Sequence, residues 1–241
     1  AVTPESLKAA YDSMLQNDTV DIYVVGDIDV EEMTEKLRQV LAFGDRELHE
    51  KQLKTEIDTK PEEYTKEQQE MKQGKLHIGF STPVYFGDPD FPKMQIFNGI
   101  FGGYAHSKLF MNVRERESLA YYASSSYSSQ YGLVFVTSGI EPSNEKKAID
   151  VINEQLKVMQ NGEISDLELT QTKAMLTNQL KEALDSARGQ IEIYDQYKDL
   201  NEAFTIDTWA SRWQQVTKED VEQMAKQVKQ EAIYFLCGKE D

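Results

Sequence analysis

Apolar residues follow two periods along this chain, one typical of helices and one typical of strands. Leu7, Tyr11 and Met14 recur at helical spacing, whereas residues 75–81 alternate between apolar and polar side chains. Residues in capping positions precede the helical stretches, and Thr217 with Asp220 three residues later is typical of a helix start. The pattern predicts strands at 20–25, 75–81, 119–129, 133–139 and 232–237, and helices at 4–15, 30–41, 91–101, 107–117, 143–158, 165–187, 190–200, 207–213 and from 217 onward.

The two ends of the chain resemble each other. TPESLKAAYDSMLQNDTVDIYVVGDID and TKEDVEQMAKQVKQEAIYFLCGKED both read as a capped helix, an apolar strand, a glycine and an acid. A two-copy architecture predicts residues 1–43 as the C-terminal tail of a preceding homologous half. Residues 44–73 are charged and poor in apolar side chains, which predicts a linker, and 74–241 would then form the second half. The alternative is that two capped helices before strands look alike by chance.

Composition narrows the function classes. The net charge of -16 and an isoelectric point near 4.7 disfavour binding to nucleic acid or to an anionic membrane. No apolar run approaches the ~20 residues of a membrane span, and no signal-peptide pattern opens the sequence. The single cysteine, Cys237, lies in an apolar run and is expected to be a buried core residue, in keeping with a cytoplasmic location. The first residue is not Met, which fits a processed chain or one cut from a longer protein.

The segment GGYAHSKLFMNVRERESLAYY, residues 102–122, carries the candidate chemistry. Arg114 lies in the last turn of its predicted helix and Tyr121 lies near the start of the next strand, so their side chains can converge. A guanidinium and a phenol are donors suited to a carbonyl oxygen that gains negative charge. Gly102 and Gly103 permit a sharp turn and close approach by another chain. The alternative is structural: Arg114 pairs with a neighbouring glutamate, and Tyr121 packs.

A longer block, GIFGGYAHSKLFMNVRERESLAYYASSSYS, resembles the "LGG…S-x-LF…LRE…LAY" signature of the second-half domain of the insulinase-like zinc peptidases, the pitrilysin or mitochondrial-processing-peptidase (M16) family. The segment ISDLELTQTKAMLTNQL is similar to a later helix of the same family. The resemblance runs from about residue 20 to the C-terminus. With the order of elements, it predicts an α+β two-layer sandwich, a mainly antiparallel sheet with long helices on one face.

The resemblance also implies a role for each half. In this family two homologous halves form a clam-shell, and the first half holds zinc on an inverted His-x-x-Glu-His helix. The second half supplies an arginine and a tyrosine that hold the substrate backbone, and these correspond to Arg114 and Tyr121. Gly102 and Gly103 are expected beside the same substrate.

The sequence departs from a zinc-bearing half. Its three histidines, His49, His77 and His106, are far apart in sequence, and no His-x-x-Glu-His occurs. We expect no catalytic residue, no metal and no cofactor in this chain, with zinc in a partner half.

The expected function is that of the non-catalytic, substrate-binding half of an insulinase-like metallopeptidase from a bacterium. Its expected partners are a peptide substrate and a homologous zinc-bearing half or subunit, in a homo- or heterodimer. The alternatives are an inactive scaffold or assembly subunit of the same family and an independent peptide-binding module.

Overall fold

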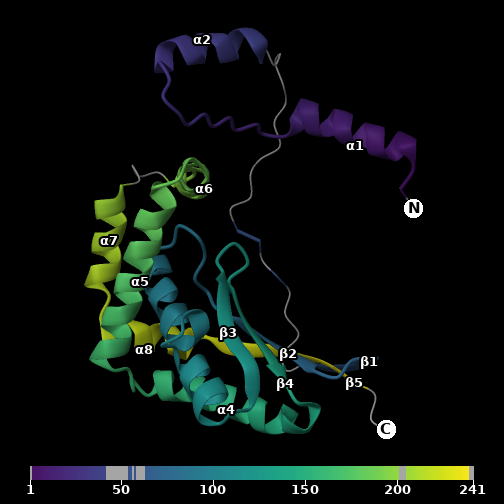
Figure 1. Ribbon diagram of the computed structural model, residues 1–241, viewed down its shortest axis with the longest axis vertical. Helices are drawn as coiled ribbons and strands as arrows, with labels where there is room; N and C mark the ends of the chain where they lie inside the picture. The colour runs from purple at the N-terminus through teal and green to yellow at the C-terminus, as the bar shows by residue number, and fades with distance from the viewer. Residues whose placement is uncertain (1, 42–53, 56, 58–62, 201–204, 239–241) are drawn as a thin grey trace. The chain divides into compact units, whose positions relative to one another are not determined.

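The computed structural model describes residues 2–41, 54–55, 57, 63–200 and 205–238 (Figure 1). The chain divides into two units. Unit 1 comprises Ala1–Gln52 and Glu182–Asp199, and unit 2 comprises Leu53–Lys181 and Leu200–Asp241. Unit 2 holds the sheet and unit 1 holds the first two helices.

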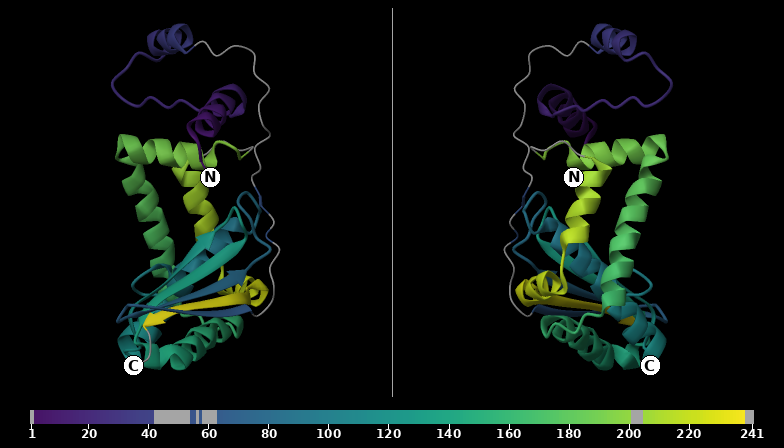
Figure 2. Two further views of the ribbon diagram at one scale, coloured as in Figure 1. Left: turned by 90° about the vertical axis from the view of Figure 1, so that its right-hand side faces the viewer. Right: turned by 90° about the vertical axis from the view of Figure 1, so that its left-hand side faces the viewer.

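Unit 2 is built on a five-stranded sheet of order β1-β5-β2-β4-β3 (Figures 1 and 2). Only β1 and β5 pair in parallel, and the other neighbours are antiparallel. The strands are β1 (Glu63–Gln69), β2 (Gly74–Ser81), β3 (Ala120–Ser128), β4 (Leu133–Ile140) and β5 (Lys229–Gly238). The predicted mainly antiparallel sheet is therefore confirmed.

Helices complete unit 2, and α4 runs along the sheet (Figure 2). In order they are α3 (Phe91–Asn98), the π-helices η1 (Gly99–Gly103) and η2 (Phe110–Arg116), the 3-10 turn η3 (Pro142–Asn144), α4 (Glu145–Gln160), α5 (Asp166–Leu184), α7 (Ile206–Gln215) and α8 (Lys218–Gln227). Burial alternates along the strands, so that Leu76, Ile78 and Phe80 of β2 are fully buried while Phe135 of β4 is exposed on the other face. One face of the sheet is thus covered by helices and the other is open, which confirms the two-layer α+β sandwich.

Local signals placed most elements correctly. The capping box at Thr217 is formed, Thr3 and Asp29 cap their helices, and Cys237 is buried as predicted. The helix that starts near Phe91 ends at Gly103, as its double glycine predicted, but its last turns are π-helical. No residue type distinguishes an α from a π turn, because the difference is one of hydrogen-bond spacing.

Two predictions made from the sequence are wrong. Residues 63–69 lie in the predicted linker, yet they form strand β1. Their polar sequence EYTKEQQ is tolerated because β1 is an edge strand whose single partner is β5. Conversely, residues 20–25 were predicted to form a strand and are apolar or aromatic except for Asp21, but they have no regular secondary structure.

Unit 1 contains α1 (Pro4–Asn17), α2 (Val30–Val40) and α6 (Ala187–Tyr197). Neither α1 nor α2 has a buried residue. None of the helices in the described ranges is both long enough and apolar enough to cross a membrane.

Candidate functional site

Arg114 lies on η2, which follows the glycine-rich loop. Its guanidinium sits over the Phe110 ring, 4.7 Å from the centroid, and its Nε is 3.6 Å from Glu115 Oε1. The side chain is 42% exposed. The pairing with Glu115 that the structural alternative predicted is therefore present, but it is long and open to solvent, and such pairs contribute little.

The backbone reverses its course directly after η2. Ser118 has φ 51°, the one positive φ among the described residues other than glycine. The amides of Glu117 and Leu119 on either side donate to the carbonyl oxygens of Asn112 and Val113. A left-handed serine is a strained choice that surrounding contacts must hold in place.

Tyr121 lies at a β-bulge. Ala120 pairs with Ile140 and Tyr122 pairs with Gly139, so Tyr121 has no residue opposite it in the ladder. A bulge redirects the side chain of its extra residue, and bulges are common beside active sites. Tyr121 is 56% exposed, and its hydroxyl donates to the carboxylate of Glu141. That hydrogen bond raises the pKa of Tyr121, so the hydroxyl keeps its proton and remains a donor.

Arg114 lies near the end of η2 and Tyr121 lies near the start of β3, on either side of one junction, and both are exposed. Among the described residues no hydrogen bond joins them. Neither the bulge at Tyr121 nor the left-handed backbone of Ser118 was predicted, because the residue types at these positions do not specify either conformation.

The two glycines differ in their surroundings. Gly102 is buried, and a Cβ there would lie 2.5 Å from the backbone nitrogen of Ser125 in β3. The close approach that Gly102 allows is thus to a strand of its own chain. Gly103 is exposed, and a Cβ there would lie 3.1 Å from the carbonyl oxygen of Asn98.

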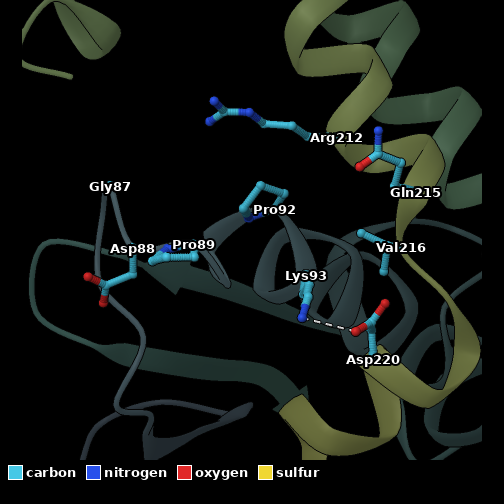
Figure 3. Close-up of a pocket in the computed structure, with 9 residues that line it drawn as sticks. All are labelled: Gly87, Asp88, Pro89, Pro92, Lys93, Arg212, Gln215, Val216 and Asp220. Carbon is cyan, nitrogen blue, oxygen red and sulfur yellow. Dashed lines mark ion pairs between the residues drawn. The ribbon is translucent and has the colours of Figure 1, made fainter. Parts of the chain in front are cut away.

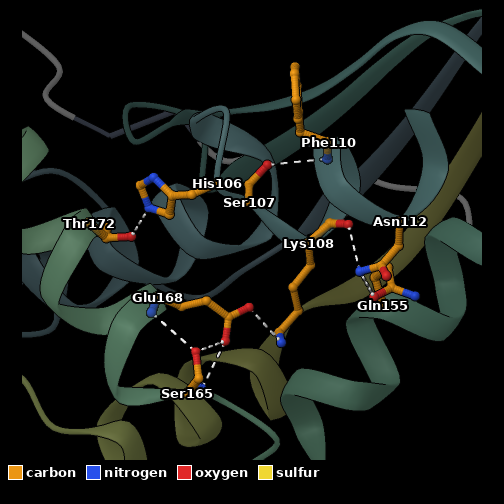
Figure 4. A network of polar contacts seen from close by, with 9 residues as sticks. All are labelled: His106, Ser107, Lys108, Phe110, Asn112, Gln155, Ser165, Glu168 and Thr172. Atoms are coloured by element: carbon orange, nitrogen blue, oxygen red, sulfur yellow. Dashed lines mark hydrogen bonds and ion pairs between the residues drawn. The ribbon is translucent and has the colours of Figure 1, made fainter. Parts of the chain in front are cut away.

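A buried polar network holds the loop and η2 in place (Figure 4). The Nζ of Lys108, which is almost fully buried, lies 2.9 Å from Glu168 Oε1 on α5. Asn112 donates to Gln155 Oε1 on α4 at 2.8 Å. The pairing of Lys108 with Glu168 was not predicted from the sequence, because the two residues lie in distant segments.

His106 and Glu168 titrate abnormally in this network. Burial lowers the pKa of His106, whose Nε2 lies 2.8 Å from Thr172 Oγ1, although Glu168 acts against the shift. Burial would raise the pKa of Glu168, but hydrogen bonds from Lys108 and Ser165 outweigh it and hold that pKa below its usual range. His106 is therefore neutral at pH 7, while Glu168 is ionised.

The two histidines that the structure describes do not lie together as zinc ligands would. His49 lies outside the described residues, His77 lies on β2 beside the Tyr234 ring, and His106 is held by Thr172. Within the described part of the chain, no group of three or more His, Cys, Asp or Glu side chains is arranged to hold a metal ion.

A separate pocket of about 510 Å³ lies where the β2–α3 loop meets α7 and α8 (Figure 3). Its lining residues are Gly87, Asp88, Pro89, Pro92, Lys93, Arg212, Gln215, Val216 and Asp220. The Nζ of Lys93 bridges Asp90 and Asp220 at 2.9 and 3.0 Å. The loop that lines the pocket begins after Ser81, at the C-terminal end of β2. Tyr121 lies at the other end of the sheet, near Gly74, where β2 begins. The pocket is therefore not part of the Arg114 and Tyr121 junction.

Comparison with known proteins identifies relatives of about twice the length. Residues 1–176 match the family model described as the peptidase M16 inactive domain. A "probable inactive metalloprotease YmfF" from Bacillus subtilis is 39% identical over 240 residues, which cover 99% of this chain and 56% of that protein. The chain thus spans little more than half the length of this relative.

Solved structures give the same picture. A conserved protein from Enterococcus faecalis matches with TM-score 0.89 and 38% identity, covering 100% of this chain and 57% of that one. A peptidase M16 inactive domain from Pseudomonas fluorescens shares the fold, with TM-score 0.76 and 17% identity over 99% of this chain and 58% of that one. The fold, the motif and the relatives agree, and the chain belongs to the M16 peptidase family, as an inactive half-domain of that family.

Proposed function

We propose that this chain is the non-catalytic, peptide-binding half of an M16 metallopeptidase, which presents Arg114 and Tyr121 to a zinc-bearing half. That half belongs either to the same protein or to a partner subunit. The observation that supports this most is the bulge at Tyr121, which takes the phenol out of the strand ladder at the junction that also bears Arg114. Both side chains are exposed at that junction, and the Tyr121 hydroxyl donates to Glu141, a bond that a substrate would replace.

The chemistry suits a substrate carbonyl. Arg114 offers several fixed N–H donors on a planar guanidinium, and the raised pKa of Tyr121 keeps its hydroxyl protonated. Donors fixed near a carbonyl stabilise the negative charge that develops on its oxygen during attack. The present contacts of Arg114 are exposed and local, so a substrate can replace them at small cost.

In this proposal zinc comes from the other half, since the described ranges of this chain contain no group of three or more His, Cys, Asp or Glu side chains arranged to hold a metal ion. The active protein is then a homo- or heterodimer, or one chain with two halves. We further propose a cytoplasmic location in a bacterium, in keeping with the acidic composition and the bacterial relatives.

The test is peptide cleavage by the complete protein together with a zinc-bearing M16 subunit. We expect Arg114→Ala and Tyr121→Phe each to lower kcat/KM by about 100- to 1000-fold, as for lost oxyanion donors. Arg116→Ala and Tyr131→Phe are matched controls, the first on the same helix and the second in the turn at the far end of the β3–β4 hairpin, and both should cleave normally. Unchanged cleavage by both test variants would refute the role given to the pair.

The chain by itself is expected not to hydrolyse peptides. A fluorogenic peptide incubated with the purified chain, with and without a chelator, checks this. Hydrolysis that survives chelation contradicts the assignment of catalysis to another half.

A scaffold role is the second candidate. It is favoured by the description of the Bacillus subtilis relative as probably inactive and by the local contacts of the pair with Phe110 and Glu141. In that case Arg114→Ala and Tyr121→Phe leave turnover unchanged and alter only assembly. An independent peptide-binding module would instead bind peptides with no zinc-bearing half present.

A further inference from the structure

The hydroxyl of Tyr121 already has an acceptor within this chain. A phenol has a single O–H donor, and that of Tyr121 donates to the carboxylate of Glu141. A peptide carbonyl can therefore take this hydrogen bond only if it displaces Glu141. The contact bears directly on the role proposed for Tyr121, because it decides when the donor is available.

Short-range backbone structure places Glu141 beside Tyr121. Glu141 directly follows Ile140, the last residue of β4, whose partner in the ladder is Ala120. On its other side the 3-10 turn η3 begins, and the amide of Asn144 donates to the carbonyl oxygen of Glu141 at 2.9 Å. The backbone of Glu141 is thus held on both sides, at the end of the hairpin where the bulge redirects Tyr121.

The charge of Glu141 is not shared with a cation. Three other acidic residues, on η2, at its C-terminal end and at the start of α4, each have a cationic partner: Glu115 with Arg114, Glu117 with Lys147, and Glu145 with Lys66. Among the described residues, no Lys, Arg or His side chain forms an ion pair with Glu141. Its carboxylate is therefore a strong acceptor, since hydrogen bonds to a charged group are roughly twice as strong as those between neutral groups.

The strength of this acceptor makes the phenol selective. The carbonyl oxygen of a bound peptide is neutral, and it is a weaker acceptor than the carboxylate of Glu141. During attack the same oxygen gains negative charge and becomes an acceptor of comparable strength. Only interactions that are stronger in the transition state than in the bound substrate accelerate the chemical step. The contact with Glu141 therefore confines the contribution of Tyr121 to the charged state.

We propose that Glu141 competes with the substrate for the Tyr121 hydroxyl, so that this donor passes to the carbonyl oxygen only when that oxygen becomes negatively charged. The inference rests on the proposed function of Tyr121. One hydrogen bond is exchanged for another, the proton stays on the phenol, and no covalent bond forms or breaks in this exchange. Glu141 thus opposes the binding of an intact peptide at Tyr121, and it regulates the site from within the same chain.

The first test measures the contact itself. The hydrogen bond to Glu141 raises the pKa of Tyr121, so Glu141→Gln should lower that pKa toward the ordinary value of about 10. An NMR titration of the chain with ring-labelled tyrosine follows the change, and Tyr121→Phe identifies the signal. Glu145→Gln is the matched control, since it removes a carboxylate that accepts from a different phenol, Tyr64, and it should leave the pKa of Tyr121 unchanged.

The second test measures the consequence for cleavage, with the complete protein and a zinc-bearing M16 subunit. We expect Glu141→Gln to raise kcat/KM by about 3- to 10-fold and to lower KM, because a neutral competitor replaces a charged one. In the Tyr121→Phe background the same substitution should have no effect, since the contested hydroxyl is absent. Glu145→Gln should leave cleavage unchanged in both backgrounds.

Each of four results overturns the proposal. An unchanged pKa of Tyr121 in Glu141→Gln would show that the two side chains share no hydrogen bond. Where Tyr121→Phe slows cleavage but Glu141→Gln does not speed it, Tyr121 keeps its proposed role and the competition is refuted. A gain from Glu141→Gln that persists without the Tyr121 hydroxyl would place the effect elsewhere. Where Tyr121→Phe leaves cleavage unchanged, the proposed function of Tyr121 fails, and this inference fails with it.

Discussion

At Gly102 the backbone of η1 lies very close to the backbone of strand β3. A Cβ there would lie 2.5 Å from the nitrogen of Ser125 and 2.6 Å from its Oγ, so η1 or β3 would have to move. We expect Gly102→Ala to lower the free energy of unfolding by about 1–3 kcal/mol, as for other overpacked positions. Urea denaturation measures the change.

Gly79→Ala is the matched control for that substitution. Gly79 also lies in the sheet unit, but its added Cβ would approach Ala232 O no closer than 4.0 Å. Its effect should stay within about 0.5 kcal/mol. Equal losses from the two alanines would mean that the short approach at Gly102 is not the cause.

His106 should make stability depend on pH between 7.5 and 5.5. Burial lowers its pKa below the ordinary value of about 6.5, so the unfolded chain binds the proton more readily than the folded chain. Stability therefore falls as the pH drops through this range. We expect the urea midpoint to fall less for His106→Gln than for the original chain.

Other groups do not obscure that comparison. The pKa of Glu168 and of Asp220 is held below the ordinary carboxylate range, so both titrate at lower pH. The pKa of His77 is also lowered, but His77 is present in both proteins and cancels. Identical pH dependence in the two proteins would contradict the burial of a neutral imidazole at position 106.

At the scale of elements, the position of η2 depends on its link to α5. Lys108 and Glu168 form an ion pair whose side chains are only 9% and 19% exposed. Removal of one partner leaves the other charge uncompensated in a poorly solvated place, and we expect Lys108→Met to cost about 3–5 kcal/mol in unfolding free energy. Lys226→Met, which breaks a more exposed pair, should cost less than about 1 kcal/mol.

The double variant separates charge from packing. Lys108→Met with Glu168→Met removes both charges and keeps similar side-chain volume, so the cost of the unpaired charge should return, whereas the hydrogen bonds from Ser165 to Glu168 stay lost. Calorimetry on the single and double variants gives the coupling. Additive losses would show that the two side chains do not act as a pair.

The elements predicted correctly from the sequence are those determined by nearby residues. The caps at Thr3, Asp29 and Thr217 act within one helical turn, and each is formed. Strand β1 could not be predicted, because its polar residues become a strand only through pairing with β5. The strand predicted at residues 20–25 was wrong for the opposite reason, since its apolar pattern has no pairing strand within the described part of the chain.

The same distinction applies to the site. Arg114 and Tyr121 could be singled out because one continuous motif contains both. The partners that position the loop, Glu168 and Thr172, come from α5 and carry no pairing signal in the sequence. The roles of Arg114 and Tyr121 in substrate binding remain a prediction for the cleavage assay.

At the scale of the whole molecule, the two units should differ in resistance to protease. The helices α1 and α2 bury no residue, whereas the sheet unit contains a large apolar core. Local opening costs least where few apolar groups are buried, so brief trypsin treatment should cut first within residues 2–41. Mass spectrometry of the surviving fragment checks this, and first cuts within β2 or β4 would contradict it.

Strand β5 follows the other four strands in sequence, yet it lies between β1 and β2, and among the described strands it alone is bonded to β1. During synthesis on a ribosome, the other four strands emerge before the one that joins β1 to them. The nascent sheet therefore waits, with β1 unattached and one side of β2 open, until residues 229–238 leave the exit tunnel. A premature stop shortly before Lys229 would release the chain with the sheet divided, as a target for chaperones and proteases.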